Sequence, residues 1–441
     1  MALALVLYLY IFFVSWTGSF VIGEWFPLHV VLLVTAVILY IPRLANDSVV
    51  PRGLYGSEDA FICIGLMMIM ISAILHPNPK TMNYLMAYFY IFGAGYFALK
   101  LLLYKNTSVE KLLWVNMAAV LLVAVFTVTD FLLYAYRGVD IQQFIPRVKP
   151  ASATYNIIFR RSYGLATEPT ILCYYFNTLG PLALWQLWRM RRGGFIIKGV
   201  LSSIVGFAWL TTFSAAGVVF MALSVFIVTV IRGAGWIIAK RKALSKKLWD
   251  SDMFSRQTAQ KFDQSPRWIG IINMPLRRIV MAVLCIAGLL FFYTPERLLH
   301  IQDFAEPLVD KVTLTGTSSA HDRMSRWRMA LESIEDHPLE GIGPGALSTA
   351  EQGSSTNWYL FLTVESGILS IVPFGTFLLC CFARILASNV AAKYWVLVGF
   401  ISAVLHLTVI STIQHPFLWV LLAIFSVACL KEGNCDAVVR G

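Results

Sequence analysis

Charged residues are scarce in this chain. They make up 13% of its 441 residues, against about 25% in a typical soluble domain. Hydrophobic residues make up 58%, where a soluble domain has about 45–50%, and the mean hydropathy is +0.71. This composition excludes an ordinary soluble domain and a disordered chain. Because a membrane-spanning helix needs roughly 20 apolar residues, the chain has room for about a dozen spans and their loops.

Familiar metal and phosphate motifs are also missing. None of the seven cysteines belongs to a CxxC pair that is matched by a second such pair or by a pair of histidines, so the sequence does not predict a zinc site. The glycine-rich stretch 341–345 lacks the GK[ST] ending of a phosphate loop, and we interpret it as a turn. The segment Met1–Phe13 lacks the basic start and cleavage site of a removed signal peptide, so we expect a retained first span.

Apolar runs long enough to cross a membrane recur along the whole chain. Solid apolar runs predict helices, whereas a lipid-facing barrel requires alternating residues and is excluded. The expected fold is an all-α, polytopic membrane bundle of about twelve transmembrane helices with a large helical outer loop. The runs lie near 2–22, 26–42, 58–76, 82–103, 112–135, 170–188, 195–212, 214–231, 278–294, 358–383, 394–411 and 415–430.

Basic residues predict how these spans are oriented. The loop 232–278 holds eleven Lys and Arg against three acidic residues, and the loop 295–357 holds five against ten. Because cytoplasmic loops are rich in Lys and Arg, we expect both termini inside and 136–169 and 295–357 outside. The net charge of +11 then reflects topology anchors on anionic lipid, and not nucleic-acid binding.

The chain is therefore expected to fall into five parts. Residues 1–135 are N-terminal transmembrane helices, and 136–169 form a first outer loop. Residues 170–294 are transmembrane helices with a basic cytoplasmic loop at 232–277. Residues 295–357 form the large outer loop, and 358–441 are C-terminal transmembrane helices with a short cytoplasmic tail. Long loops are often functional, although a passive cap is the alternative.

The second long loop contains a predicted helix that carries several arginines. Ser319 to Asp322 matches a helix-start signal, apolar residues follow at helical spacing, and Pro338 ends the pattern, which predicts an amphipathic helix over 319–336 at the outer membrane boundary. Arg323 and Arg326 offer forked donors that suit phosphate oxygens. The alternative is local salt bridges with the acidic residues of the same helix.

The first long loop ends in a second arginine group. Arg160 and Arg161 precede the span at 170, followed by Glu168 and Pro169. They could snorkel to the interface, but two arginines on the outer side run against the usual charge distribution and suit an anion. We expect the two loops to converge on a diphosphate, with His321 as the residue best placed to take a proton. Asp130 lies in an apolar run and should face the bundle interior.

The stretch from Arg323 to Gly367 resembles the signature of the O-antigen ligase and polysaccharide polymerase superfamily. The matching positions are an Arg separated from a Trp by three residues, an HPL-G-G-G run, an Asn-Trp-x-Leu start and a Glu-x-Gly. The upstream segment from Arg161 to Pro169 resembles the second arginine site of that family. The matching residues are Arg323, Trp327, His337–Gly345, Asn357, Leu360, Glu365 and Gly367.

The resemblance implies a GT-C type glycosyltransferase of the bacterial inner membrane whose active site faces the periplasm. Its donor would be an undecaprenyl-diphosphate-linked glycan, and its acceptor a glycan hydroxyl. It implies no metal and no cofactor, and as partners the lipid bilayer, a flippase and a chain-length regulator, but no nucleic acid. The resemblance assigns the diphosphate to Arg161 and Arg323, with Arg160 and Arg326 as adjacent alternates.

One departure from the family pattern separates two activities. Where the ligases have a His before Asn357, this chain has Thr356, and a threonine hydroxyl is no base near neutral pH. His321 or Glu168 would have to substitute, and Asn357 and Glu365 are expected to contact substrate. We therefore favour a polymerase over a ligase. A sugar or lipid transporter is the alternative from another class, but no internal repeat supports it; a non-catalytic scaffold is a third.

Overall fold

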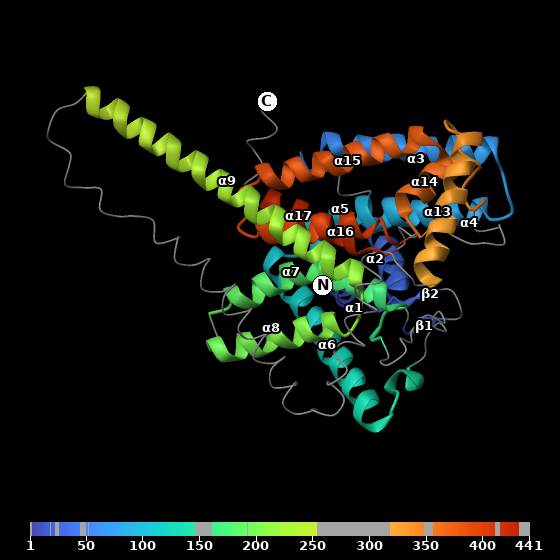
Figure 1. Ribbon diagram of the computed structural model, residues 1–441, viewed down its shortest axis with the longest axis horizontal. Helices are drawn as coiled ribbons and strands as arrows, with labels where there is room; N and C mark the ends of the chain where they lie inside the picture. The colour runs from blue at the N-terminus through green and yellow to red at the C-terminus, as the bar shows by residue number, and fades with distance from the viewer. Residues whose placement is uncertain are drawn as a thin grey trace.

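The computed structural model describes residues 2–17, 19–22, 26–44, 50–51, 53–145, 161–191, 193–253, 318–347, 356–410 and 415–431. Nearly all of them are helical (Figure 1), which confirms the expected all-α class. The strands in these ranges are β1 (Val21–Ile22) and β2 (Phe26–Pro27), which pair antiparallel with Ile22 opposite Phe26.

The helices coincide with the predicted apolar runs. Eleven of the twelve runs have a helical counterpart, and the ninth, 278–294, lies outside the described residues. The helices are α1 (Ala2–Phe13), α2 (Leu28–Leu44), α3 (Ser57–Leu75), α4 (Thr81–Tyr88), the π-helix η1 (Phe89–Ala98), α5 (Leu99–Asn106), α6 (Val109–Arg137), the 3-10 helix η2 (Ile141–Phe144), α7 (Pro169–Arg189), α8 (Phe195–Leu210), α9 (Ala215–Met253), α13 (Ser318–Asp336), α14 (Trp358–Ser366), α15 (Ile368–Ala387), α16 (Lys393–His406) and α17 (Phe417–Lys431).

Five of these helical segments are long and apolar enough to cross a membrane. They are Ser57–Leu75, Thr81–Asn106, Val109–Arg137, Ala215–Arg241 and Ile368–Ala387. Five further helices are apolar but only 10–17 residues long. A helix satisfies all its interior backbone polar groups within itself, which is the condition for entering hydrocarbon. The protein is thus a helical membrane protein, whereas the full number of twelve crossings stays a prediction.

Two predicted runs are interrupted. The run 2–22 ends as a helix at Phe13, and the chain turns there because Trp16 N donates to the carbonyl of Phe13. The run 358–383 is divided at Gly367 into α14 and α15. Hydropathy averaged over the length of a span reports neither break, because the apolar residues on both sides outweigh the few polar ones at each break, such as Ser15 and Thr17 at the first and Glu365 and Ser366 at the second.

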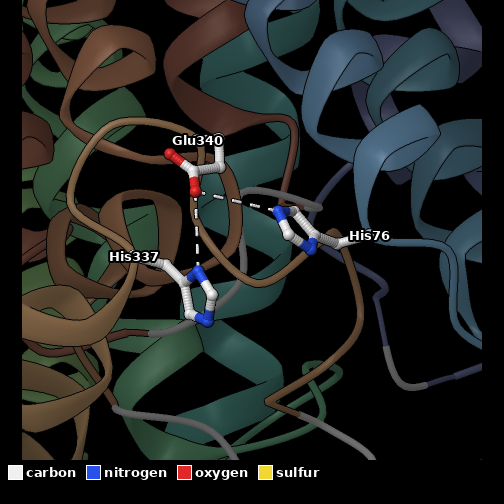
Figure 2. Close-up of side chains that lie close together, drawn as sticks. All are labelled: His76, His337 and Glu340. Atoms are coloured by element: carbon white, nitrogen blue, oxygen red, sulfur yellow. Dashed lines mark ion pairs between the residues drawn. The ribbon is translucent and has the colours of Figure 1, made fainter.

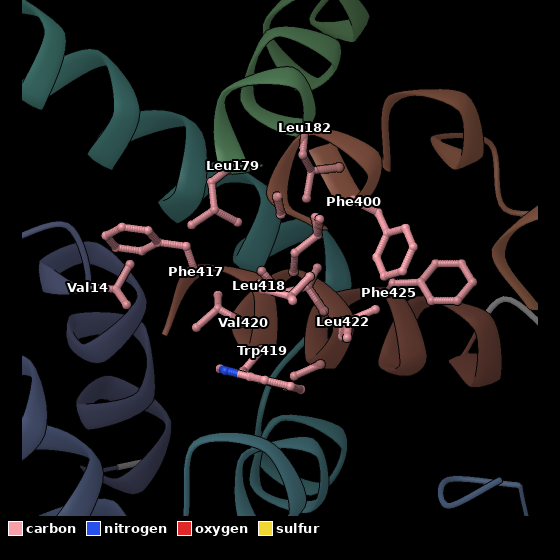
Figure 3. Close-up of a cluster of buried hydrophobic side chains, with 14 of the residues drawn as sticks. Val14, Leu179, Leu182, Phe400, Phe417, Leu418, Trp419, Val420, Leu422 and Phe425 are labelled. Carbon is pink, nitrogen blue, oxygen red and sulfur yellow. The ribbon is translucent and has the colours of Figure 1, made fainter. Parts of the chain in front are cut away.

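The core surrounds α17, which is buried along almost its whole length (Figure 3). Trp419 packs its ring against Phe92, Tyr96 and Phe377, with ring centroids 4.9, 5.6 and 5.9 Å away. Helix α7 is similarly enclosed, between α6 and α16. These two helices form the fixed interior of the bundle, and α3 lies along α15 at its edge (Figure 1).

Buried charged groups of the described helices have polar partners. Lys100 is fully buried, and its Nζ lies 2.8 Å from Oδ2 of Asp59, whose Oδ1 accepts from the hydroxyl of Tyr96 at 2.7 Å. Asp130 is 1% exposed, so the expectation that it faces the interior is confirmed, and Gln142 donates to it. Unpaired charges would be costly there, so these contacts fix how α3, η1, α5 and α6 are placed.

Loops that the charge pattern assigns to the outer side contact one another. Ser162 N donates to the carbonyl of Thr211 and Trp358 N to that of Leu407, both at 2.9 Å. The side-chain amide of Asn78 donates to the carbonyl of Pro344, also at 2.9 Å. Helices α13, α14 and α4 gather at this end of the molecule (Figure 1).

Segments assigned to the inner side contact one another in the same way. Arg384 pairs with Glu58 and donates to the carbonyl of Gly53 at 3.2 Å, and Arg43 donates to Asn106 at 3.4 Å. In these examples, segments assigned to the outer side contact outer segments and segments assigned to the inner side contact inner segments. An alternating topology of the helices would produce this separation.

This separation is tested by labelling two exposed positions. Leu339 lies on the outer set of loops and Arg191 on the inner set. We expect Leu339→Cys and Arg191→Cys, each in a Cys63→Ala background, to react with an impermeant maleimide from opposite faces of sealed, uniformly oriented vesicles. Both should react after permeabilisation. Labelling of both from one face of intact vesicles would contradict the alternating topology.

Candidate functional site

Arg161 is held by the turn between α8 and α9. Residues 161–168 lead into α7, which begins at Pro169, a residue suited to the first helical position because its missing N–H needs no partner there. Ser162 N donates to the carbonyl of Thr211, and Arg161 Nε donates to the carbonyl of Thr212 at 3.1 Å. Arg161 is thus held against the bundle by its own side chain.

The charge of Arg323 on α13 affects the ionisation of Arg161. Burial lowers the pKa of Arg161, the positive charge of Arg323 lowers it further, and Glu168 raises it. An arginine nevertheless stays protonated in a protein. The structure thus brings Arg161, Arg323 and the exposed Glu168 into one electrostatic environment. Two guanidinium groups that repel each other gain from an anion placed between them.

The helix that carries Arg323 has the predicted bounds. Helix α13 covers Ser318–Asp336, against the predicted 319–336. Ala330 is buried, whereas Met324 and Leu331, seven residues or about two helical turns apart, are more than half exposed. Such an apolar surface suits the membrane boundary, although that placement stays a prediction.

The segment after α13 is hydrogen-bonded to the junction of α14 and α15. Ile342 N donates to the carbonyl of Val364, Gly343 N to that of Glu365, and Ile368 N to that of Pro338, each at 2.9 Å. These three bonds attach the glycine-rich stretch, and with it the end of α13, to the bundle. The interpretation of residues 341–345 as a turn agrees with this geometry.

Glu365 belongs to the same attachment. It is fully buried, and its Oε1 accepts from Gly345 N at 2.7 Å. Burial raises the pKa of Glu365, and the bond from Gly345 lowers it in part. Glu365 lies near the end of α14, which with nine residues is too short to span a membrane. Glu365 therefore positions the glycine-rich segment, while its expected contact with substrate stays a prediction.

Asn357 also has a structural partner. Its Oδ1 accepts from Tyr359 N at 3.0 Å and from Leu360 N at 3.3 Å, so it caps the start of α14. Thr356 before it adopts a φ of +54°, in the left-handed region. Thr356 and Asn357 thus precede α14, whose first residue, Trp358, donates its N–H to the carbonyl of Leu407.

Two other expected residues lie wholly or partly outside what the structure describes. Arg160 falls outside the described residues, and His321 is on the first turn of α13 with its side chain outside them. Their assignments, and that of Arg326 on α13, stay predictions.

One group of residues was not predicted from the sequence. His76 at the end of α3 meets His337 and Glu340 from the turn after α13 (Figure 2). Glu340 Oε1 lies 3.5 Å from His337 Nδ1 and 4.0 Å from His76 Nε2. The spacing of His337 and Glu340 could have suggested a pair of ligands, but both residues had been assigned to the family signature. His76 is too distant in sequence for any spacing rule to connect it with them.

Comparison with known proteins identifies no family to which the chain can be assigned. No protein-family model matches the chain, and no curated protein matches it.

A glycine substitution tests the attachment of the segment after α13. Gly367 has a φ of +74°, and a Cβ there would lie 1.8 Å from the carbonyl oxygen of Leu339. Gly367→Ala must separate two backbone segments, so we expect it to lower the apparent Tm in detergent by several degrees or to prevent folding.

Gly375→Ala is the matched control, because Gly375 lies within α15 and a Cβ there meets nothing within 4 Å. Alanine favours a helix over glycine by roughly 1 kcal/mol, so this variant should be as stable as the parent. Equal stability of the two variants would show that the close approach does not matter.

Proposed function

We propose that the protein is a membrane glycosyltransferase that polymerises undecaprenyl-diphosphate-linked oligosaccharide repeat units into a surface polysaccharide. The reaction takes place at the periplasmic face of the bacterial inner membrane. The observation that carries the proposal is that two segments remote in sequence are both bonded to the bundle, Arg161 to the carbonyl of Thr212 and the end of α13 to the α14–α15 junction, and that the charge of Arg323 on α13 lowers the pKa of Arg161. A lipid diphosphate is an anion that enters such a site from the membrane with its sugar toward water.

The chemistry follows from the charge of the leaving group. A hydroxyl of the acceptor sugar attacks the anomeric carbon of the donor, and the bond from that carbon to the diphosphate oxygen breaks. Direct displacement inverts the anomeric centre, and the hydroxyl proton passes to His321 or Glu168. Arg161 and Arg323 stabilise the negative charge that grows on the departing diphosphate. This step requires no metal and no nucleotide sugar.

The structure also supports a fixed site at the expected end of the bundle. The backbone bonds of residues 338–345 hold the end of α13 to the α14–α15 junction, and Arg161 is bonded to the α8–α9 turn. Preorganised donors contribute most to catalysis because they need no reorganisation during the reaction.

An O-antigen ligase that transfers the polysaccharide to lipid A core, or to a protein, is the first alternative. It would use the same arginines but needs a base at the position of Thr356. The hydroxyl of Thr356 is buried and has no hydrogen-bond partner among the described residues, which favours a polymerase that does not use this position.

A sugar or lipid transporter is the second alternative. The buried pair of Asp59 and Lys100 is the feature that favours it, because charged residues within spans often line transport pathways. Their mutual bonds and the hydroxyl of Tyr96 satisfy this pair, however, as in a structural ion pair.

Substitution of the two arginines tests the site. We expect Arg161→Ala and Arg323→Ala each to reduce the transfer rate by about 10²–10³-fold, as loss of a charge-stabilising donor typically does. Arg328→Ala, on the exposed face of α13, is the matched control and should retain the parental rate. The readout is polymer length in a complemented deletion strain, at equal protein level in the membrane. Normal polymer from both site variants would remove these residues from the site.

The deletion strain itself separates the candidate functions. Single repeat units in place of long chains indicate a polymerase, and long chains that stay on the lipid carrier indicate a ligase. Unchanged glycans of both kinds would exclude a glycosyltransferase and favour transport.

A further inference from the structure

A compact set of metal-binding side chains lies beside the proposed transfer site. We call His76, His337 and Glu340 the outer histidine cluster. Figure 2 shows both imidazole rings directed toward the carboxylate of Glu340, and one ligand atom from each residue lies within 4.8 Å of the others. Their side chains are 32%, 42% and 38% exposed, so an ion from solution can reach them.

The donor set is that of a zinc site. Two histidines and one glutamate are three protein ligands that Zn²⁺ commonly takes with a water molecule in the fourth position. With bonds of about 2.1 Å, the ligand atoms of a tetrahedral site are about 3.4 Å apart. The separation between Glu340 and His337 is already 3.5 Å, and that between Glu340 and His76 is 4.0 Å. Small rotations of partly exposed side chains close the remaining gap.

The backbone beneath the cluster is already in place. Asn78 lies two residues after His76, and its side-chain amide donates to the carbonyl of Pro344 at 2.9 Å. Gly343 has a φ of +94°, and a Cβ there would lie 2.0 Å from the carbonyl oxygen of His76, so the two segments are in direct contact. An ion would therefore bind without any ordering of the main chain, which is the condition for a preorganised site.

We propose that His76, His337 and Glu340 bind a Zn²⁺ ion that clamps the α3–α4 connection to the segment linking α13 and α14. The ion joins two outer segments, and a water molecule completes its coordination. The ion takes no part in the transfer chemistry, and its binding does not depend on the proposed function. The competing explanation is an ordinary ion pair between Glu340 and a protonated histidine, which needs no metal.

Zinc binding to the purified, full-length protein tests the proposal. After treatment with EDTA and its removal, the protein in detergent is titrated with ZnCl₂ by calorimetry, and bound zinc is measured by elemental analysis. We expect one Zn²⁺ per chain and a higher apparent Tm with zinc than without. His76→Ala, His337→Ala and Glu340→Gln should each weaken binding by at least about 10-fold, by analogy with lost metal-site contacts.

Glu335→Gln is the matched control, because Glu335 is an exposed carboxylate near the end of α13 and outside the cluster. It should bind zinc like the parent. Glu340→Gln keeps the size of the side chain, and its Tm without zinc shows that it is folded. Absence of zinc binding, or zinc binding that the three variants leave unchanged, would overturn the proposal, whatever the outcome of the glycan assays.

Discussion

The arrangement of the outer end depends on one close approach of two backbones. The segment after α13 can contact the α14–α15 junction only because Gly341 and Gly367 lack side chains there. The hydrogen bonds across this contact attach α13 to the bundle. Arg323 on α13 then comes within electrostatic reach of Arg161, which is bonded to the α8–α9 turn.

The rest of the bundle supplies a rigid frame for that end. Helices α7 and α17 are enclosed by their neighbours, and aromatic packing around Trp419 fills the centre. The paired charges of Asp59 and Lys100 fix α3 against η1 and α5. A frame of this kind suits an enzyme whose groups must be placed before the donor arrives, whereas an alternating transporter needs halves that move past each other.

Local sequence patterns predicted the positions of the helices well, and tertiary contacts explain the helix break that the patterns did not predict. The capping signal, the apolar spacing and Pro338 located α13 to within one residue, because those features act within a few turns. Hydropathy did not reveal the break at Gly367, since the approach of Leu339 that causes it is remote in sequence.

The same limitation applied to the site. The outer charge pattern and the family resemblance predicted that arginines from both outer loops would converge; the charge of Arg323 does lower the pKa of Arg161, while their joint binding of a diphosphate stays a prediction. The helix cap made by Asn357 and the bond from Gly345 to Glu365 were missed, because a motif marks a position without stating its contacts. The meeting of His76 with Glu340 depends on the packing of α3 and cannot be read from spacing.

The most direct test of the central claim is transfer by the purified protein in liposomes. The protein would be given an undecaprenyl-diphosphate-linked repeat unit, and the glycan products would be separated by size while released undecaprenyl diphosphate is measured. The account predicts chains longer than one repeat and one lipid diphosphate released for each bond formed. A donor that stays unextended and attached to its lipid, with folded protein and every partner glycan supplied, would contradict it.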